Sequence, residues 1–179
     1  IEYMYQYLHY ENESSILDGK QIREGWLKHI KKNEENFLWV SNQAAFDLMN
    51  DGMIPPATSL PENNPYYEMI DAQLTTEIFG FFAPARPDIA LKISHLPIRT
   101  TAKLNSEWIA EFYVIMYSLA SYVNKDLNLR DKIFWMSKQA RKRLPNDSYS
   151  AKMYDFVKTS YEANIPWEQT RDMIYYKFQ

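Results

Sequence analysis

Apolar residues recur along most of the chain at intervals of three and four, the spacing of one face of a helix. No segment alternates apolar and polar residues for long enough to predict a strand, and β-branched residues are sparse. The sequence therefore predicts an all-α fold, with residues 1–179 forming a single helical domain. The first stripe, Ile1, Met4, Tyr5 and Leu8, has no capping residue before it, which indicates that the natural chain begins earlier.

Capping residues and prolines divide this pattern into separate helices. Asp18 and Gln21 resemble a capping box ahead of a helix that extends to about residue 33. Ser41 is expected to cap the next helix, which Gly52 ends, and residues 53–64 have the composition of a loop. The remaining helix starts are expected at Asn64–Pro65, Pro87, Asn105 or Ser106, Asn128, Asp147 or Ser148, and Pro166.

The helix predicted from Asn64–Pro65 to Phe82 carries two kinds of side chain. Its apolar positions, at helical spacing, are Ile70, Leu74, Ile78 and Phe81. Its polar positions are Asp71, Gln73, Thr75, Thr76 and Glu77. Such a polar group often lines a cleft, but a solvent-facing stripe has the same pattern, and the residues alone leave both interpretations open.

The composition describes a soluble, well-packed globular protein, with 46% hydrophobic and 24% charged residues. A net charge of -3 gives no basic surface for nucleic acid or for an anionic membrane, and we expect neither as a partner. The longest apolar run, residues 112–123, is too short to span a bilayer. No compartment is assigned, with the cytoplasm favoured.

Few residue patterns point to catalysis. The chain has no Cys, which excludes disulfides, thiolate metal sites and a cysteine nucleophile. Its four Gly form no phosphate-binding loop, and His9, His29 and His95 lie too far apart for a zinc motif. No nucleophile elbow and no Asp-x-Asp pair is present. The residues by themselves describe a helical domain without an assigned activity.

Several short motifs in the same order resemble the ADP-ribosylglycohydrolase family. They are residues 38–42 with 52–56 behind them, residues 70–74 through 79–80, residues 83–90, and the helix 107–120. The resemblance covers roughly residues 1–125. It implies a compact, orthogonal bundle of helices, of which this chain is the internal part.

The resemblance also implies an activity and a cofactor. Members of this family cleave ADP-ribose, or a related ribosyl group, from an acceptor in a cleft that holds two divalent metals, Mg²⁺ or Mn²⁺. The metals orient the ribose and position a water for attack. The motifs that supply their ligands precede the first helix or lie near the C-terminus of the family fold, outside these 179 residues. We therefore assign no metal ligand and no catalytic residue in this chain.

The resemblance places three substrate-binding residues in the segment from 71 to 75. Asp71 and Gln73 are the best candidates for polar contacts to ribose or phosphate, and Thr75 stands where many members have Arg. The alternative is that these side chains form hydrogen bonds that fix the helix ends around the cleft. Two further departures are Ala85, in place of a family Gly, and the absence of His near Thr100, where the family has a Ser-His pair.

Two functions remain from the sequence. The first is part of a metal-dependent hydrolase acting on an ADP-ribosylated substrate or a small ribosyl compound. The alternative is a non-catalytic helical binding or interaction module derived from the same fold. The sequence gives neither the acceptor nor the oligomeric state.

Overall fold

A computed structural model describes residues 16–31, 34 and 37–178 of the chain. These residues form helices joined by turns, and none of them lies in a strand, which confirms the predicted all-α class. The stripe from Ile1 to Leu8 lies outside the described residues.

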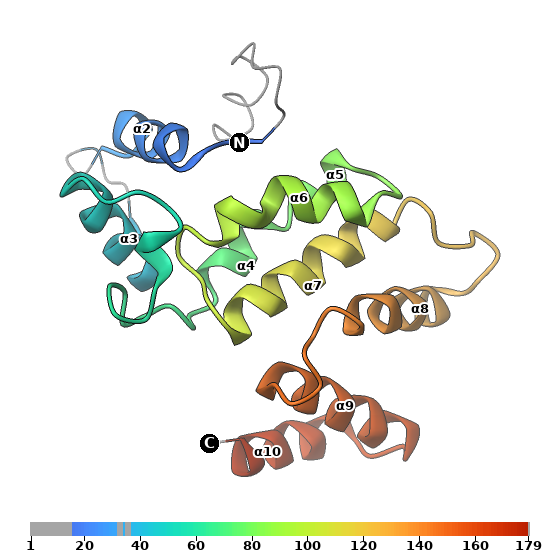
Figure 1. The fold of residues 1–179 in the computed structure, drawn as a ribbon. Helices are drawn as coiled ribbons and strands as arrows, with labels where there is room; N and C mark the ends of the chain where they lie inside the picture. Colours follow the sequence, from blue (N-terminus) through green and yellow to red (C-terminus); the bar gives the residue numbers. More distant parts are fainter. Residues whose placement is uncertain (1–15, 32–33, 35–36, 179) are drawn as a thin grey trace.

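Two long helices, α6 (Pro87–Ile98) and α7 (Asn105–Leu119), form the centre of the molecule (Figure 1). The short helices α4 (Asp71–Thr76) and α5 (Phe79–Phe82) pack against both. Alanine dominates the core between them, so the helix backbones approach closely. The buried residues of this core are Ala72, Phe79, Ala83, Ala90, Ile98, Ala102, Ala110 and Val114.

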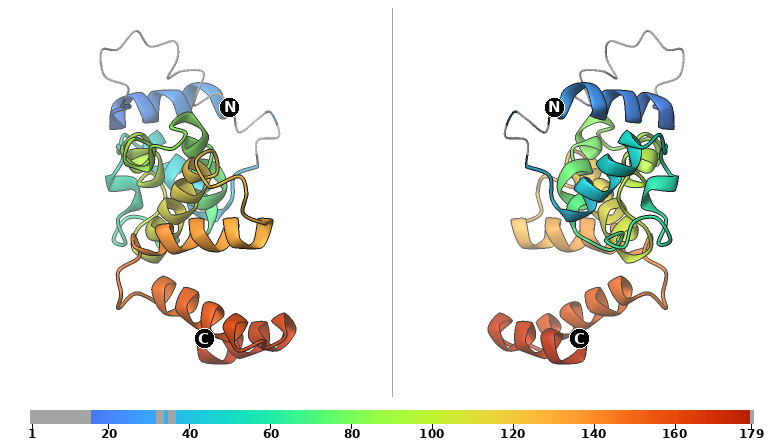
Figure 2. Two further views of the ribbon diagram at one scale, coloured as in Figure 1. Left: turned by 90° about the vertical axis from the view of Figure 1, so that its right-hand side faces the viewer. Right: turned by 90° about the vertical axis from the view of Figure 1, so that its left-hand side faces the viewer.

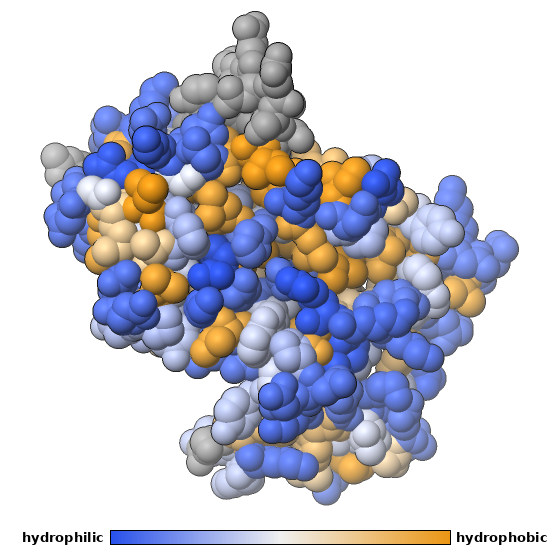
Figure 3. Space-filling model, in the orientation of Figure 1, coloured by the Kyte–Doolittle hydropathy of each residue, from blue (hydrophilic) through white to orange (hydrophobic). Residues whose placement is uncertain are grey.

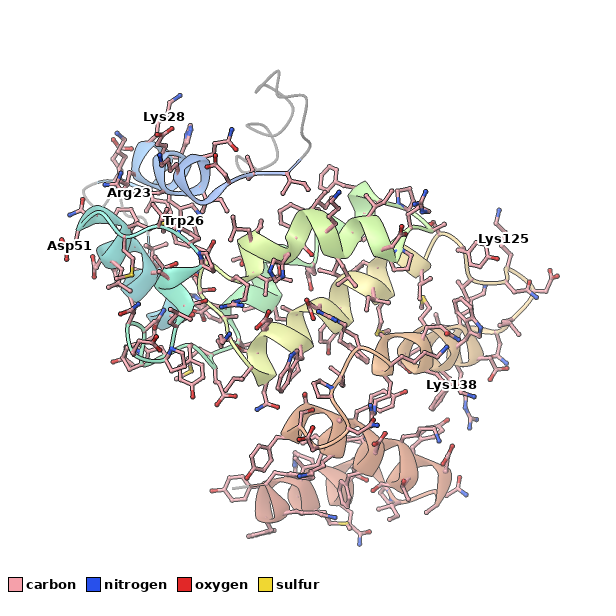
Figure 4. All side chains as sticks on the ribbon, viewed as in Figure 1. Arg23, Trp26, Lys28, Asp51, Lys125 and Lys138 are labelled. Atoms are coloured by element: carbon pink, nitrogen blue, oxygen red, sulfur yellow. The ribbon has the colours of Figure 1, made fainter. Side chains whose placement is uncertain are left out.

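Helices α2 (Gly19–His29) and α3 (Val40–Asn50) pack together beside this centre. The predicted capping box of α2 is confirmed: the Gln21 amide donates to Asp18 Oδ1 at 2.9 Å, and the Asp18 amide donates to Gln21 Oε1 at 3.0 Å. Arg23 and Trp26 lie on the side of α2 that faces α3 (Figure 4). The Arg23 Nε donates to the carbonyl oxygen of Met49 at 2.5 Å, which ties the two helices together.

Buried polar side chains anchor the loop between α3 and α4, which contains the short 3₁₀ helix η1 (Ala57–Ser59). The Thr58 hydroxyl donates to the Thr100 carbonyl at 2.7 Å. The Asn64 carboxamide, fully buried, donates to the carbonyls of Ser41 and Thr58 at 3.2 and 3.3 Å. These hydrogen bonds give buried backbone carbonyl groups a partner within the protein in place of water.

Three further helices follow, α8 (Leu129–Arg141), α9 (Tyr149–Glu162) and α10 (Trp167–Lys177). The side chains of Asn128 and Ser148 cap α8 and α9, as predicted. Helix α8 packs on α7, whereas α9 and α10 project as a pair from the body of the molecule (Figure 2). Arg141 and Asp155, 2.7 Å apart, join α8 to α9.

The structure corrects two predicted helix starts. The helix expected at Asn64–Pro65 does not begin there, because residues 65–70 form turns and α4 begins at Asp71. The buried Asn64 amide is used by the loop, so the backbone after it follows the loop rather than a helix. Ser41 is not the N-cap of α3, since that position belongs to Trp39, whose side chain makes no capping bond.

Helices α4 and α5 turn their small residues inward. Ala72, Thr76, Gly80 and Ala83 are all buried, and a Cβ at Gly80 would lie 2.5 Å from the Val114 carbonyl oxygen. The apolar stripe that begins at Ile70 therefore faces outward, although such stripes ordinarily face the core. Figure 3 shows hydrophobic residues gathered on the surface over α5 and α6.

Candidate functional site

Asp71 caps helix α3 from a distance of thirty residues along the chain. Its Oδ2 accepts hydrogen bonds from the backbone amide of Ser41 at 2.8 Å, the Ser41 hydroxyl at 2.6 Å and the amide of Asn42 at 3.1 Å. Ser41 and Asn42 are the second and third residues of α3, so their amides have no partner within the helix. The carboxylate, only 3% exposed, supplies that partner and places negative charge at the positive end of the helix dipole.

This geometry corresponds to the alternative expectation for Asp71, in which its hydrogen bonds fix the helix ends. The cap compensates for Trp39, whose side chain gives α3 no capping bond. A contact between Asp71 and a substrate stays a prediction.

An open hollow of about 740 Å³ lies between the start of α3 and the turns before α4. Its wall is mainly apolar and aromatic, with carboxylates at Asp47 and Asp71. Trp39 is 53% exposed and Tyr66 is 41% exposed, so both rings are accessible to a bound molecule. The lining residues are Phe37, Leu38, Trp39, Val40, Gln43, Ala44, Asp47, Tyr66, Met69, Ile70 and Asp71.

Gln73 and Thr75, the other two predicted substrate-binding residues, are not part of this lining. Gln73 is half-buried on α4. Thr75 is exposed, and its hydroxyl donates to the carbonyls of Asp71 and Ala72 one turn earlier, at 3.0 and 3.3 Å. The structure therefore brings Asp71 to the hollow without the other two, and the predicted roles of Gln73 and Thr75 stay predictions.

A group of metal-ligating residue types lies between α6 and α7. His95, Glu107 and Glu111 each place one ligand atom within 4.8 Å of the others. Arg143 donates to both oxygens of the buried Glu111 carboxylate, at 2.6 and 2.8 Å. Arg99 lies 3.6 Å from Glu107. The hydrogen bonds from Arg143 to Glu111 raise the pKa of the Arg143 guanidinium.

These contacts do not fit the dinuclear Mg²⁺ or Mn²⁺ centre that the resemblance implies. Each Mg²⁺ requires six ligands, mostly oxygens, in octahedral geometry. The group between α6 and α7 offers two carboxylates and one imidazole, and arginine already neutralises both carboxylates. It forms an ion-pair network that joins α6, α7 and the segment after α8. Within the described residues, the ligands of a dinuclear centre are therefore not provided by this group.

Sequence reasoning missed the hollow, although one signal was present. Residues 37–40, Phe-Leu-Trp-Val, form an apolar run directly before the expected cap at Ser41. The start of a helix does not require large hydrophobic side chains, so such a run indicates a contact with another segment. The missing information was that the turns at 66–70 lie against this run. Hydrogen bonds from Ser41 to Asp71 join the two segments there.

No protein-family model, no curated protein and no solved structure matches the chain. The resemblance to the ADP-ribosylglycohydrolase family therefore stays a prediction from the sequence motifs.

Proposed function

We propose that this helical domain supplies the nucleoside-binding wall of a metal-dependent hydrolase, which cleaves ADP-ribose or a related ribosyl group from an acceptor. The observation that carries the proposal is the aromatic hollow next to Asp71, the residue that the family resemblance assigns to substrate binding.

The hollow suits an adenosine group in size and chemistry. Its volume of about 740 Å³ lies within the range of small-molecule sites. The accessible rings of Trp39 and Tyr66 offer faces on which a base can stack. The carboxylates of Asp47 and Asp71 are hydrogen-bond acceptors for ribose hydroxyls or for the amino group of adenine.

The hollow does not suit a diphosphate. None of its lining residues is Lys or Arg, so this wall provides no cation to neutralise phosphate oxygens. Divalent metals bound by residues outside these 179 would supply the positive charge that a diphosphate needs, together with Lewis-acid chemistry. We therefore assign the nucleoside end of the substrate to this wall.

The backbone at Ala85 adds support for the resemblance. Ala85 has φ 61°, a left-handed conformation that favours glycine. The resemblance places a family glycine at this position. The conformation is therefore the one that the family residue would adopt most easily.

The alternative function is a non-catalytic module that binds the same ligand. It is favoured by the internal use of Asp71, whose Oδ2 already accepts three hydrogen bonds. Under this alternative the chain binds adenosine or ADP-ribose but releases no ADP-ribose from an acceptor.

Calorimetry with adenosine and with ADP-ribose, each with and without Mg²⁺, tests the ligand. We expect adenosine to bind without metal. Trp39→Ala should weaken this binding by about 1–3 kcal/mol, or roughly 5- to 150-fold, which is the effect of losing one stacked aromatic ring. The matched control is Trp167→Ala, since Trp167 is 69% exposed on α10 and should leave adenosine binding unchanged.

The release of ADP-ribose from an ADP-ribosylated protein, with and without Mg²⁺, separates the two functions. Metal-dependent release supports the hydrolase, and binding without release supports the module. If neither ligand gives heat in any condition, or if both tryptophan variants weaken binding equally, the assignment of the hollow is wrong.

A further inference from the structure

One polar pair lies on the otherwise apolar α3 wall of the hollow. Gln43 and Asp47 are one helical turn apart, so their side chains are neighbours on the same face of α3. The Gln43 Nε2 donates to Asp47 Oδ1 at 3.0 Å, and both residues line the hollow. This hydrogen bond fixes which atoms of Gln43 are presented to a bound molecule.

The carboxylate of Asp47 determines the orientation of the Gln43 carboxamide. A carboxylate only accepts hydrogen bonds, whereas a carboxamide has an acceptor oxygen on one side and a donor NH₂ group on the other. Turning the carboxamide over would place Oε1 against the carboxylate and lose the bond. Among the described residues, this is the one side-chain hydrogen bond of Gln43. Its oxygen and its second N–H hydrogen are therefore left for a ligand, in a fixed order.

An acceptor beside a donor is the pattern that recognises adenine. The 6-amino group of adenine donates and the adjacent ring nitrogen accepts, so the two polar atoms of a glutamine carboxamide can bind both at once. In inosine a 6-oxygen replaces the amino group, which sets an acceptor against Gln43 Oε1. Inosine also has a donor at N1, but this donor pairs with the fixed Gln43 only if the base turns and the ribose moves with it.

The rest of the lining does not favour a base with a 6-oxygen. Neither Lys nor Arg is among the lining residues, so no charged donor is available to that oxygen. The donors at N1 and N2 of guanine match the two oxygens of a carboxylate, but Asp47 Oδ1 already accepts from Gln43. Asp71 Oδ2 likewise accepts three hydrogen bonds at the start of α3. The lining therefore favours a base with an amino group at position 6.

We infer that Gln43 determines the base specificity of the hollow and that Asp47 positions it. The preferred ligands are nucleosides with a 6-amino group, adenosine and ADP-ribose among them, and 6-oxopurine nucleosides such as inosine and guanosine bind more weakly. The inference rests on the proposed function, because it requires a nucleoside in the hollow. It narrows the related ribosyl groups of that proposal to those that carry a 6-aminopurine.

Calorimetry on the full chain with adenosine, inosine and guanosine tests the specificity. The three nucleosides are uncharged and have the same ribose, so they differ only in the base. We expect adenosine to bind about tenfold more tightly than inosine or guanosine, which is the discrimination given by one bidentate pair at a partly exposed site. Trp39→Ala should weaken adenosine and inosine by the same factor, because stacking on a ring does not depend on the group at position 6.

Two substitutions test the two residues. Gln43→Met keeps the length of the side chain but removes its polar atoms, so it should weaken adenosine about tenfold and leave inosine unchanged. Asp47→Asn gives Gln43 a partner that donates as well as accepts, so the carboxamide can turn over and the preference for adenosine should largely disappear. Gln169→Met, at an exposed position on α10, is the matched control and should leave every affinity unchanged. Circular dichroism checks the fold of each variant.

The outcomes separate this inference from the proposed function. If adenosine binds but inosine or guanosine binds as tightly, or if Gln43→Met weakens adenosine and inosine equally, Gln43 does not determine the base and the nucleoside site stands without it. A preference for adenosine that Asp47→Asn leaves intact would overturn the positioning role of Asp47. If no nucleoside gives heat in any condition, the proposed function fails and this inference fails with it.

Discussion

Removing the carboxylate of Asp71 should separate its structural role from a role in binding. In the folded chain this one oxygen accepts two backbone amides and one hydroxyl at the start of α3. Asp71→Ala leaves those donors without a protein partner at a site that is nearly buried, since Asp71 and Ser41 are 3% and 1% exposed. It also removes the only side chain seen to cap α3 among the described residues.

The expected loss can be worked from these contacts. A buried donor that loses its partner costs about 1–3 kcal/mol, and loss of a helix cap costs about 0.5–2 kcal/mol. The Ser41 hydroxyl can rotate to another acceptor, so two amides carry most of the loss. We expect Asp71→Ala to lower the free energy of unfolding by about 3 kcal/mol. Asp71→Asn keeps an acceptor oxygen but no charge, and should lose about 1–2 kcal/mol.

Urea unfolding followed by circular dichroism measures both values. Asp172→Ala is the control, because this exposed aspartate of α10 pairs at the surface with its neighbour Arg171, and its loss should stay within about 0.5 kcal/mol. A loss below that level for Asp71→Ala would refute the capping role. Unchanged adenosine affinity in a folded Asp71→Asn variant would assign Asp71 to structure alone, whereas weaker affinity would assign it to the ligand as well.

Four further predictions test the packing and the ion pairs. Gly80→Ala should destabilise the chain by about 2 kcal/mol, although alanine is the better helix former, because its Cβ would lie 2.5 Å from a carbonyl oxygen of α7; thermal unfolding gives the sign. Ala85→Gly should stabilise the chain by about 0.5–1 kcal/mol, because φ is 61° there; urea unfolding with an unchanged slope is the measurement. The pKa of Asp155 lies below its usual 3.8, because Arg141 donates a hydrogen bond to the carboxylate. This pair therefore stabilises the fold above that pH, and the stabilisation is lost as the pH falls through the pKa of the folded state. Asp155→Asn should therefore lower stability near neutral pH and have no effect in strong acid, in urea melts across the pH range. Arg143→Ala should lower the free energy of unfolding by about 3 kcal/mol, because it leaves the Glu111 carboxylate, which is 2% exposed, without its partner. Glu111→Ala should lower it by about 1–2 kcal/mol, because the Arg143 side chain that it leaves is 47% exposed. Equal losses in urea unfolding would contradict this order.

Local signals in the sequence predicted the features that depend on neighbouring residues. The capping box of Asp18 and Gln21 and the caps at Asn128 and Ser148 all form as expected. Each involves residues three positions apart, so the sequence contains all the information that the bond requires. The all-α class follows from the same short-range periodicity.

The features that the sequence did not predict depend on contacts between distant segments. Ser41 has the side chain of a cap, but Asp71 supplies the cap instead from thirty residues away. Asn64 has the pattern of a helix start, yet its buried amide binds the carbonyls of Ser41 and Thr58. The hollow likewise lies between α3 and the turns before α4. Its position could not be predicted from local sequence patterns, because the two sides of the hollow are distant along the chain.

Two faces of the helical segment 70–82 compete for burial against α7. Its large apolar side chains would gain more from burial than its small ones, and Phe79 is buried, but α7 approaches so closely at Gly80 that no larger side chain fits at that position. Five large apolar side chains therefore stay 40–55% exposed, which forgoes about 5 kcal/mol of burial in total; they are Ile70, Leu74, Ile78, Phe81 and Phe82.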